Sequence, residues 1–174
     1  LTIGKAIGGG IPTGTFGMTQ AIADTIKKMV ELEIIDTGGI GGTLAGNALS
    51  LAAMRATLTQ VLTQENFDRM IDLGTRWSDG VDAAITEFDL PWSCNRLGAR
   101  GEYIFGKVAP VTGADANNSG DFELEQYLHL RMLNDGFLIT PFHNMALMCP
   151  DTTSADVDAH TAAFRKMCAE LVEA

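Results

Sequence analysis

Residues 1–14 read LTIGKAIGGGIPTG and place a single lysine, Lys5, beside three glycines at positions 8–10. Two interpretations of this stretch compete. In the first, Lys5 is a solvated loop lysine and the glycines form turns. In the second, the Lys5 amine is a nucleophile that forms an imine with a carbonyl cofactor, which requires a setting that lowers its pKa. Composition alone does not choose between the two.

A second glycine-rich stretch, DTGGIGGTLAGN, occupies residues 36–47. Its Gly-Gly-Thr turn, ending at Thr43, precedes an expected helix and offers backbone amides and a hydroxyl to a phosphate. In the alternative, Thr43 only caps that helix. One nucleophilic lysine and one anion site are what a pyridoxal phosphate enzyme requires from this part of its chain.

Charge and cysteine usage exclude several classes of protein. The 174 residues carry 22 acidic and 12 basic side chains, a net charge of -10 that argues against a nucleic acid partner. No apolar run approaches the ~18–20 residues that span a bilayer, so no membrane partner is expected. Three cysteines without a C-x-x-C pair predict free thiols of a cytoplasmic protein. The three histidines lack ligand-like spacing, so no metal site is expected.

Periodicity predicts a chain with two parts: glycine-rich loops and helices in residues 1–90, and a small α+β unit in residues 91–174. A loop is expected at TGADANNSG, and the last helix begins at a T-x-x-D cap formed by Thr153 and Asp156. The predicted helices cover residues 20–32, 47–62, 64–87 and 121–135, and one more from about 154. The predicted strands cover residues 15–18, 102–105, 137–140 and 145–148.

Other candidate motifs are weaker. The G-x-x-x-x-G-K frame at residues 101–107 is followed by Val108 where a phosphate-binding loop needs Ser or Thr. His129 and His160 fall on predicted helices and are expected to be partly exposed. His143, between two short predicted strands, could face a cleft.

Three segments together resemble one family. Residues 2–14 match T-x-G-K-x-I-G-G-G-x-P-x-G, and residues 41–49 match G-G-T-x-x-G-N-P-L with Ala48 in place of the proline. Residues 136–158, GFLITPFHNMALMCPDTTSADVD, are similar to the same proteins. These are the class III (fold type I) pyridoxal-phosphate-dependent aminotransferases, in the branch of glutamate-1-semialdehyde aminomutase and the ω-transaminases. The resemblance implies an α/β fold and the C-terminal part of such an enzyme: residues 1–90 would be the end of the large domain with an interdomain helix, and residues 91–174 the small domain.

The resemblance also implies roles for individual residues. Lys5 would hold pyridoxal 5'-phosphate, and Gly42 and Thr43 would bind its phosphate, with Thr43 donated to the neighbouring site of a homodimer. Phe142 and His143 would lie near the substrate entrance. That segment has no arginine, so Arg96 and Arg100 are the candidates for a substrate carboxylate, although both also suit an exposed strand edge. Whether the donor is an amino acid or a simple amine stays open.

The implied activity is ping-pong transfer of an amino group between an amine donor and a carbonyl acceptor. The alternatives are an intramolecular aminomutase and a non-catalytic module that assembles with another chain. In the family, the aspartate and the aromatic that contact the cofactor ring precede the lysine, and this chain starts at Leu1. We therefore expect an upstream half to be needed, and the apolar faces of the glycine-rich strand and of the helix that starts at Asn47 to be exposed without it.

Overall fold

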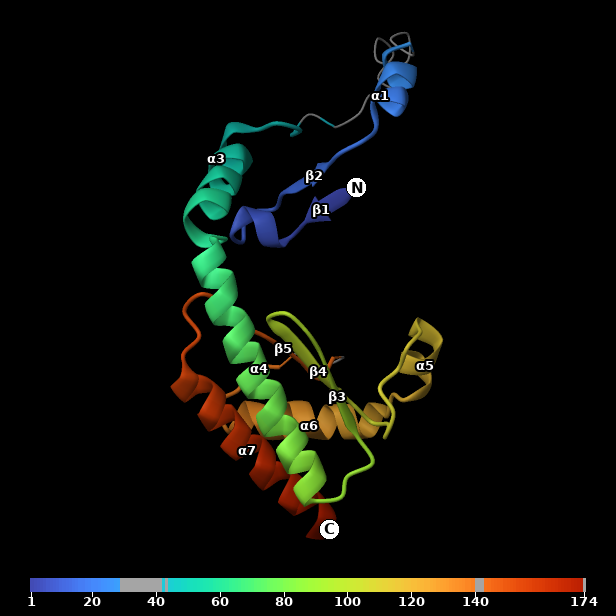
Figure 1. The fold of residues 1–174 in the computed structure, drawn as a ribbon, viewed down its shortest axis with the longest axis vertical. Coiled ribbons are helices and arrows are strands. Elements are labelled where there is room, and N and C mark those ends of the chain that lie inside the picture. Colours follow the sequence, from blue (N-terminus) through green and yellow to red (C-terminus); the bar gives the residue numbers. More distant parts are fainter. Residues whose placement is uncertain (29–41, 43, 140–142, 174) are drawn as a thin grey trace. The chain divides into compact units, whose positions relative to one another are not determined.

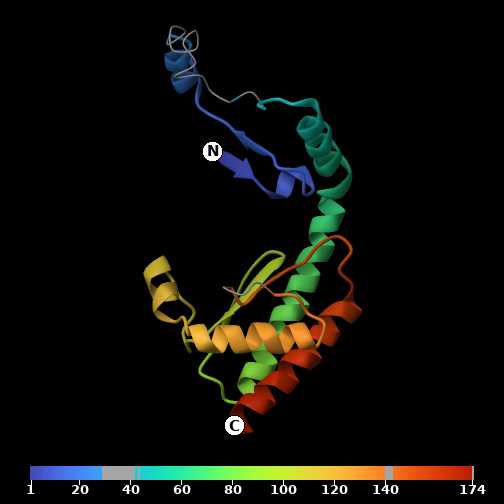
Figure 2. The same cartoon turned by 180° about the vertical axis from the view of Figure 1, so that it is seen from behind.

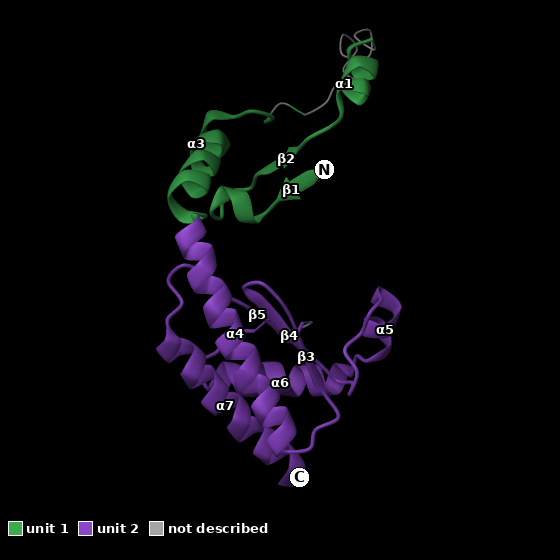
Figure 3. Cartoon of the chain, in the orientation of Figure 1, with its two compact units in different colours: residues 1–63 green, residues 64–174 purple. Residues whose placement is uncertain are grey.

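The computed structural model describes residues 1–28, 42, 44–139 and 143–173, which form two compact units, 1–63 and 64–174 (Figures 1 and 3). Each unit is described by itself. The helix α4 (Gln64–Glu87) belongs to the second unit because it packs along α7 (Ser154–Glu173). The predicted domain boundary between residues 90 and 91 concerns the domains of a whole enzyme and stays a prediction.

The first unit is built on a short antiparallel hairpin. Strand β1 (Thr2–Gly4) pairs with β2 (Gly14–Phe16). The 3-10 turn η1 (Ala6–Gly8) lies between them. Three further elements follow along the chain: α1 (Gln20–Lys27), α3 (Ala48–Ala56) and the π-helical turn η2 (Thr57–Val61). The strand β1 was not predicted, and residues 29–32 of the first predicted helix lie outside the described residues.

Few side chains of this unit are buried. Among its described residues, Ile7 is the buried hydrophobic side chain, and the polar residue Thr57 of η2 is buried as well. Large apolar side chains are instead exposed, and this was expected for the glycine-rich strand and for the helix that starts at Asn47. The exposed residues are Leu1, Ile3, Phe16, Met18, Ile22, Leu44, Leu49, Leu51, Leu58 and Val61. A two-stranded hairpin needs more apolar cover than this to be stable by itself.

The second unit is a three-stranded antiparallel sheet packed against helices. Its strands β3 (Ser93–Leu97), β4 (Arg100–Ile104) and β5 (Met145–Leu147) lie in the order β3-β4-β5. The helix α4 packs on β3 and β4, and α6 (Phe122–Asn134) packs on α7. Figures 1 and 2 show the short helix α5 (Gly113–Asn118) set apart from this helical layer.

An aromatic cluster forms the core of the second unit. Tyr103 packs against Phe164 with ring centroids 4.9 Å apart and stacks on Trp92 at 5.9 Å. Trp77 on α4 lies over Gly101 of β4, where a Cβ atom would overlap the indole. These side chains are almost completely buried, and we expect this core to supply most of the stability of the unit.

Most predicted elements of this unit are present. The helix at 64–87 is confirmed. The helix α6 is capped by Asp121 and ends before Gly136, whose φ of 91° is the left-handed conformation of a C-terminal cap. At the start of α7, Thr153 and Asp156 form the reciprocal bonds of a capping box.

Three expectations are wrong, and one strand was not predicted. The predicted loop at 112–120 contains α5, because Thr112 and Asp115 form the same kind of capping box. The strand β3 was missed, and residues 137–139 form no strand, because β4 pairs instead with residues 145–147. His160 is buried at 8% exposure and not partly exposed, because it lies on the inner face of α7.

Candidate active site

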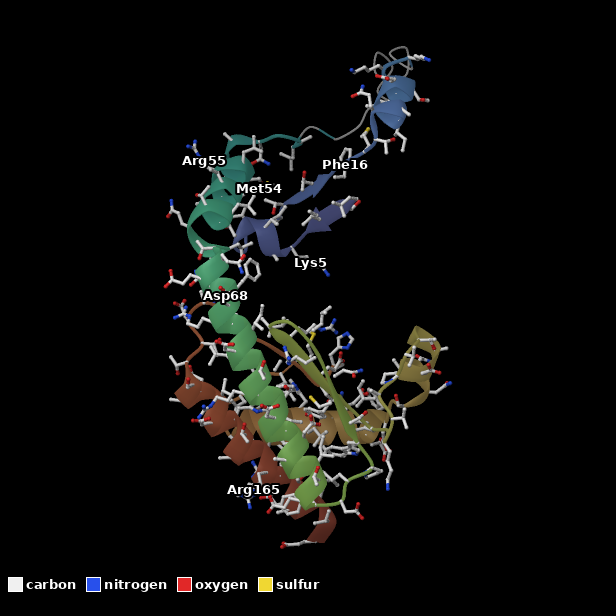
Figure 4. The ribbon with its side chains drawn as sticks, viewed as in Figure 1. Lys5, Phe16, Met54, Arg55, Asp68 and Arg165 are labelled. Atoms are coloured by element: carbon white, nitrogen blue, oxygen red, sulfur yellow. The ribbon has the colours of Figure 1, made fainter. Side chains whose placement is uncertain are left out.

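Lys5 lies at the end of the β1–β2 ladder. The last strand pair is Gly4 with Gly14, and Lys5 follows as the N-cap residue of η1. Its φ of 57° and ψ of -74° are rare for a residue that carries a Cβ atom. Such a conformation costs on the order of 1–3 kcal/mol and is concentrated at functional sites. The side chain is exposed and extends away from the backbone of the turn (Figure 4).

The local backbone explains why glycine occupies two of the positions after Lys5. A Cβ atom at Gly8 would overlap the side chain of Thr13, so the two segments approach this closely only with glycine there. Gly9 has a φ of 57°, which favours glycine. The glycine run is therefore explained by the turn itself, and it does not decide between the two interpretations of Lys5.

The segment that follows Gly42 lies against the segment that follows the glycine run of residues 8–10. Ser50 on α3 donates a hydrogen bond of 3.2 Å to the Pro12 carbonyl, directly after the glycine run. Together the two segments surround a cavity of about 130 Å³, lined on one side by Thr13 and on the other by Asn47. The Thr13 hydroxyl is buried and has no hydrogen-bond partner among the described residues. The fold thus joins two motifs that are separated by about thirty residues in the sequence.

The N-terminus of α3 is capped by Asn47. The Asn47 side-chain oxygen accepts a hydrogen bond of 2.9 Å from the Ser50 amide, so Asn47 takes the capping role that the alternative interpretation gave to Thr43. Thr43 itself lies outside the described residues. Gly42 is exposed, and its carbonyl accepts from the Ala45 amide at 2.8 Å. The first turn of α3 has no acidic residue, so its positive end is available to an anion.

In the second unit, a carboxylate joins two of the predicted substrate residues. Glu102 accepts from Arg100 at 2.9 Å through one oxygen, and its other oxygen lies 3.2 Å from Nδ1 of His143. All three line a pocket of about 480 Å³. The sequence left open whether His143 faces a cleft or is only structural, and the structure places it in the lining of this pocket. Its role near the substrate entrance stays a prediction. Phe142 lies outside the described residues.

The two candidate arginines differ in their surroundings. Arg96 donates to the Gly98 carbonyl at 3.1 Å, within the turn between β3 and β4. Arg100 lies in the pocket, held by Glu102 and by the sulfur of Met145 at 2.8 Å. Sequence reasoning missed Glu102. The i, i+2 spacing of Arg100 and Glu102 on a strand was the signal that places both on one face of the sheet.

Residues 1–63 fit a lysine-bound pyridoxal phosphate in two respects. An exposed primary amine stands on a strained backbone, and a helix N-terminus without a carboxylate lies in the same unit. In the described part of the chain, no group of three or more His, Cys, Asp or Glu side chains could hold a metal ion. None of the helices among the described residues combines the length and the apolar composition of a membrane span.

Comparison with known proteins identifies relatives along nearly the whole chain. The chain is 30% identical over 167 residues to glutamate-1-semialdehyde 2,1-aminomutase 1 of Staphylococcus carnosus, covering 94% of this chain and 37% of that protein. The fold superposes on a glutamate-1-semialdehyde aminomutase from Pseudomonas aeruginosa with a TM-score of 0.90 and 43% identity. That match covers 98% of this chain and 38% of the other.

The chain is a homologue of glutamate-1-semialdehyde aminomutases and of transaminases. A β-phenylalanine aminotransferase from Variovorax paradoxus also superposes, with a TM-score of 0.79, 25% identity and 97% of this chain covered against 38% of that one. The homologous aminomutases and transaminases confirm the predicted resemblance and the fold type I class. The chain spans less than two fifths of the length of these relatives. No family model matches it.

Proposed function

We propose that this chain is the C-terminal part of a pyridoxal-phosphate-dependent enzyme that transfers an amino group from an amine or amino-acid donor to a keto or aldehyde acceptor. The observation that carries the proposal is the strained backbone of Lys5 within the motif of residues 2–14, in a chain homologous to aminomutases and transaminases. A solvated loop lysine gains nothing from this conformation, whereas a lysine that must present its amine at one position does.

Lys5 is the residue that would hold the cofactor, through a covalent bond from Nζ to the aldehyde carbon. When bound, pyridoxal phosphate supplies an electron sink for the bond that breaks at the amine-bearing carbon. The freed Nζ of Lys5 would then carry a proton between that carbon and the C4′ carbon of the cofactor. Gly42 and Thr43, before the N-terminus of α3, would bind the phosphate. Following the resemblance, Thr43 would serve the neighbouring site of a homodimer.

Arg100 and His143 are the proposed substrate residues of the second unit, together with Phe142. Arg100 and His143 line the pocket of about 480 Å³ and are joined through Glu102. An intramolecular aminomutase is the second candidate function, favoured by the 43% identity to the Pseudomonas aeruginosa aminomutase. It would use Lys5 in the same role. A cytoplasmic location completes the proposal.

Borohydride reduction of the whole protein loaded with pyridoxal phosphate, followed by peptide mapping, tests the assignment. We expect a pyridoxyl adduct on the peptide that contains Lys5, lost in Lys5→Ala and kept in Lys107→Ala, which changes another exposed lysine. An adduct confined to other lysines, or none, would refute the proposal and favour a non-catalytic module. Assays with alanine, 1-phenylethylamine and glutamate-1-semialdehyde then separate transaminase from aminomutase activity.

A further inference from the structure

The pocket of about 480 Å³ in the second unit has more negative than positive charge around it. It is lined by residues of β4, α5, the start of α6 and residues 143–144. Figure 1 shows where β4, α5 and α6 lie in the second unit. Its formal charges come from two carboxylates, Glu102 and Glu125, and one guanidinium, Arg100. This volume lies within the range of about 300–1,000 Å³ that is usual for small-molecule sites.

The single guanidinium is already neutralised. Arg100 is paired with Glu102 at 2.9 Å, and its Nε is directed to the sulfur of Met145. A carboxylate ligand that approached Arg100 would therefore compete with Glu102 and be repelled by it. The pocket is poorly suited to a carboxylate as long as this ion pair is intact.

The second carboxylate, on α6, has no compensating charge. The Glu125 side chain is half-buried and has no ion-pair or hydrogen-bond partner among the residues that the structure describes. Asp121 caps α6, and Glu123 and Glu125 lie in its first turn. The N-terminus of a helix is equivalent to about half a positive charge, so three carboxylates exceed what the helix dipole can offset. The excess negative charge of Glu125 faces the pocket.

Apolar side chains line the rest of the pocket. Ile104 and Phe105 continue from β4, and Ala116 contributes from α5. Nearby amide and hydroxyl groups of Asn117 and Ser119 can accept hydrogen bonds from an ammonium group. One end of a ligand would thus meet apolar surface and the other end a carboxylate with polar neighbours.

We propose that this pocket binds a primary ammonium ligand with an apolar arm, and that Glu125 is the residue that recognises the charge. The inference deepens the proposed function, because it states the ligand class of the pocket that contains Arg100 and His143. A simple arylalkylamine fits this pocket better than an amino acid does, since an amino acid carries a carboxylate as well. The binding itself requires neither Lys5 nor the cofactor.

Titration of the isotope-labelled chain, without cofactor, with three ligands of similar shape tests the inference by NMR. The ligands are 3-phenylpropylamine, the neutral 4-phenylbutan-1-ol and the anionic 4-phenylbutanoate. We expect the amine to shift the backbone amides of Tyr103, Asn117 and Glu125 and to bind at least about fivefold more tightly than the alcohol, as one partly buried charge pair provides. We expect the carboxylate to bind most weakly.

Two variants and a matched control sharpen the test. Glu125→Gln is expected to remove the preference for the amine over the alcohol, whereas Glu123→Gln, in the same helical turn but outside the pocket lining, keeps it. Glu102→Gln releases Arg100 and is expected to increase the affinity for 4-phenylbutanoate. Equal affinities for amine and alcohol, no effect of Glu125→Gln, or no shift at the highest amine concentration would each overturn the inference.

Failure of this inference can be told apart from failure of the Lys5 assignment. The Lys5→Ala chain should bind the amine as the natural chain does, because Lys5 does not line the pocket. Absence of a pyridoxyl adduct at Lys5 would leave the amine titration unchanged, and absence of amine binding would leave the adduct unchanged.

Discussion

The indole Nε1–H of Trp77 donates a hydrogen bond of 3.1 Å to Nδ1 of His160 in the core of residues 64–174. Nδ1 can accept this bond only when it carries no proton, so the His160 ring must be neutral with its proton on Nε2. The ring is also enclosed by Phe137 and Phe164. Burial lowers the pKa of His160 to about 4. Burial in the core and the hydrogen bond from Trp77 therefore both favour the neutral form of His160.

Acidification should destabilise the second unit through His160. Its pKa is 6.5 in a model peptide and about 4 in the folded chain, so between these values the unfolded state binds more protons. The contribution is fully present above pH 6.5 and decreases as the pH falls to 4, by about 3 kcal/mol in all. Urea unfolding measured from pH 7 to pH 4 checks this. In His160→Gln, which can still accept from Trp77, the decrease should be smaller by that amount; an unchanged slope would contradict the prediction.

Replacing Tyr103 by phenylalanine should stabilise the protein. The Tyr103 hydroxyl is buried and has no hydrogen-bond partner among the described residues. Burial raises the pKa of this group, as expected for a phenol surrounded by apolar side chains. Removing an unsatisfied buried hydroxyl should increase the free energy of unfolding by about 1 kcal/mol. Tyr127→Phe, at a residue that is 38% exposed, is the control and should change little. A loss of stability in Tyr103→Phe would show that the hydroxyl has a partner after all.

Gly101 should tolerate no side chain. A Cβ atom there would overlap the Trp77 ring, which cannot move away because it is held by His160. We expect Gly101→Ala to lower the free energy of unfolding by about 1–3 kcal/mol, as overpacking of a core does. Gly113→Ala is the matched control, since a Cβ atom there meets nothing within 4 Å. Thermal unfolding of both variants would settle the comparison, and equal melting temperatures would argue against this tight packing.

Glycine at position 5 should stabilise the chain relative to alanine. The φ of 57° at Lys5 is strained for any residue with a Cβ atom, and alanine retains that strain. The free energy of unfolding of Lys5→Gly should therefore be about 1 kcal/mol higher than that of Lys5→Ala. Neither variant has an amine at this position that could bind a carbonyl cofactor. Chemical denaturation of the two variants side by side is the measurement. Equal stability would mean that the strain is absent, and with it the structural argument for the special position of this lysine.

Local sequence signals predicted the elements whose stabilising contacts lie within one segment. The helix at 64–87 and the cap formed by Thr153 and Asp156 are examples. The T-x-x-D signal was recognised at residue 153 but missed at residue 112, where it starts α5. The strand β3 could not be found in this way because it depends on pairing with β4, which is a contact between segments.

The candidate site shows the same division. The amino acid sequence by itself showed the motif spacing that resembles the aminotransferases, and this resemblance assigned the cofactor to Lys5, which stays a prediction. It left open whether His143 faces a cleft. Only the tertiary structure revealed that Glu102 joins Arg100 to His143, and that Asn47 rather than Thr43 caps α3. It also showed that Lys5 is held in a strained conformation. Side-chain pairing and backbone strain arise from how segments are brought together in space, which no local pattern of residues records.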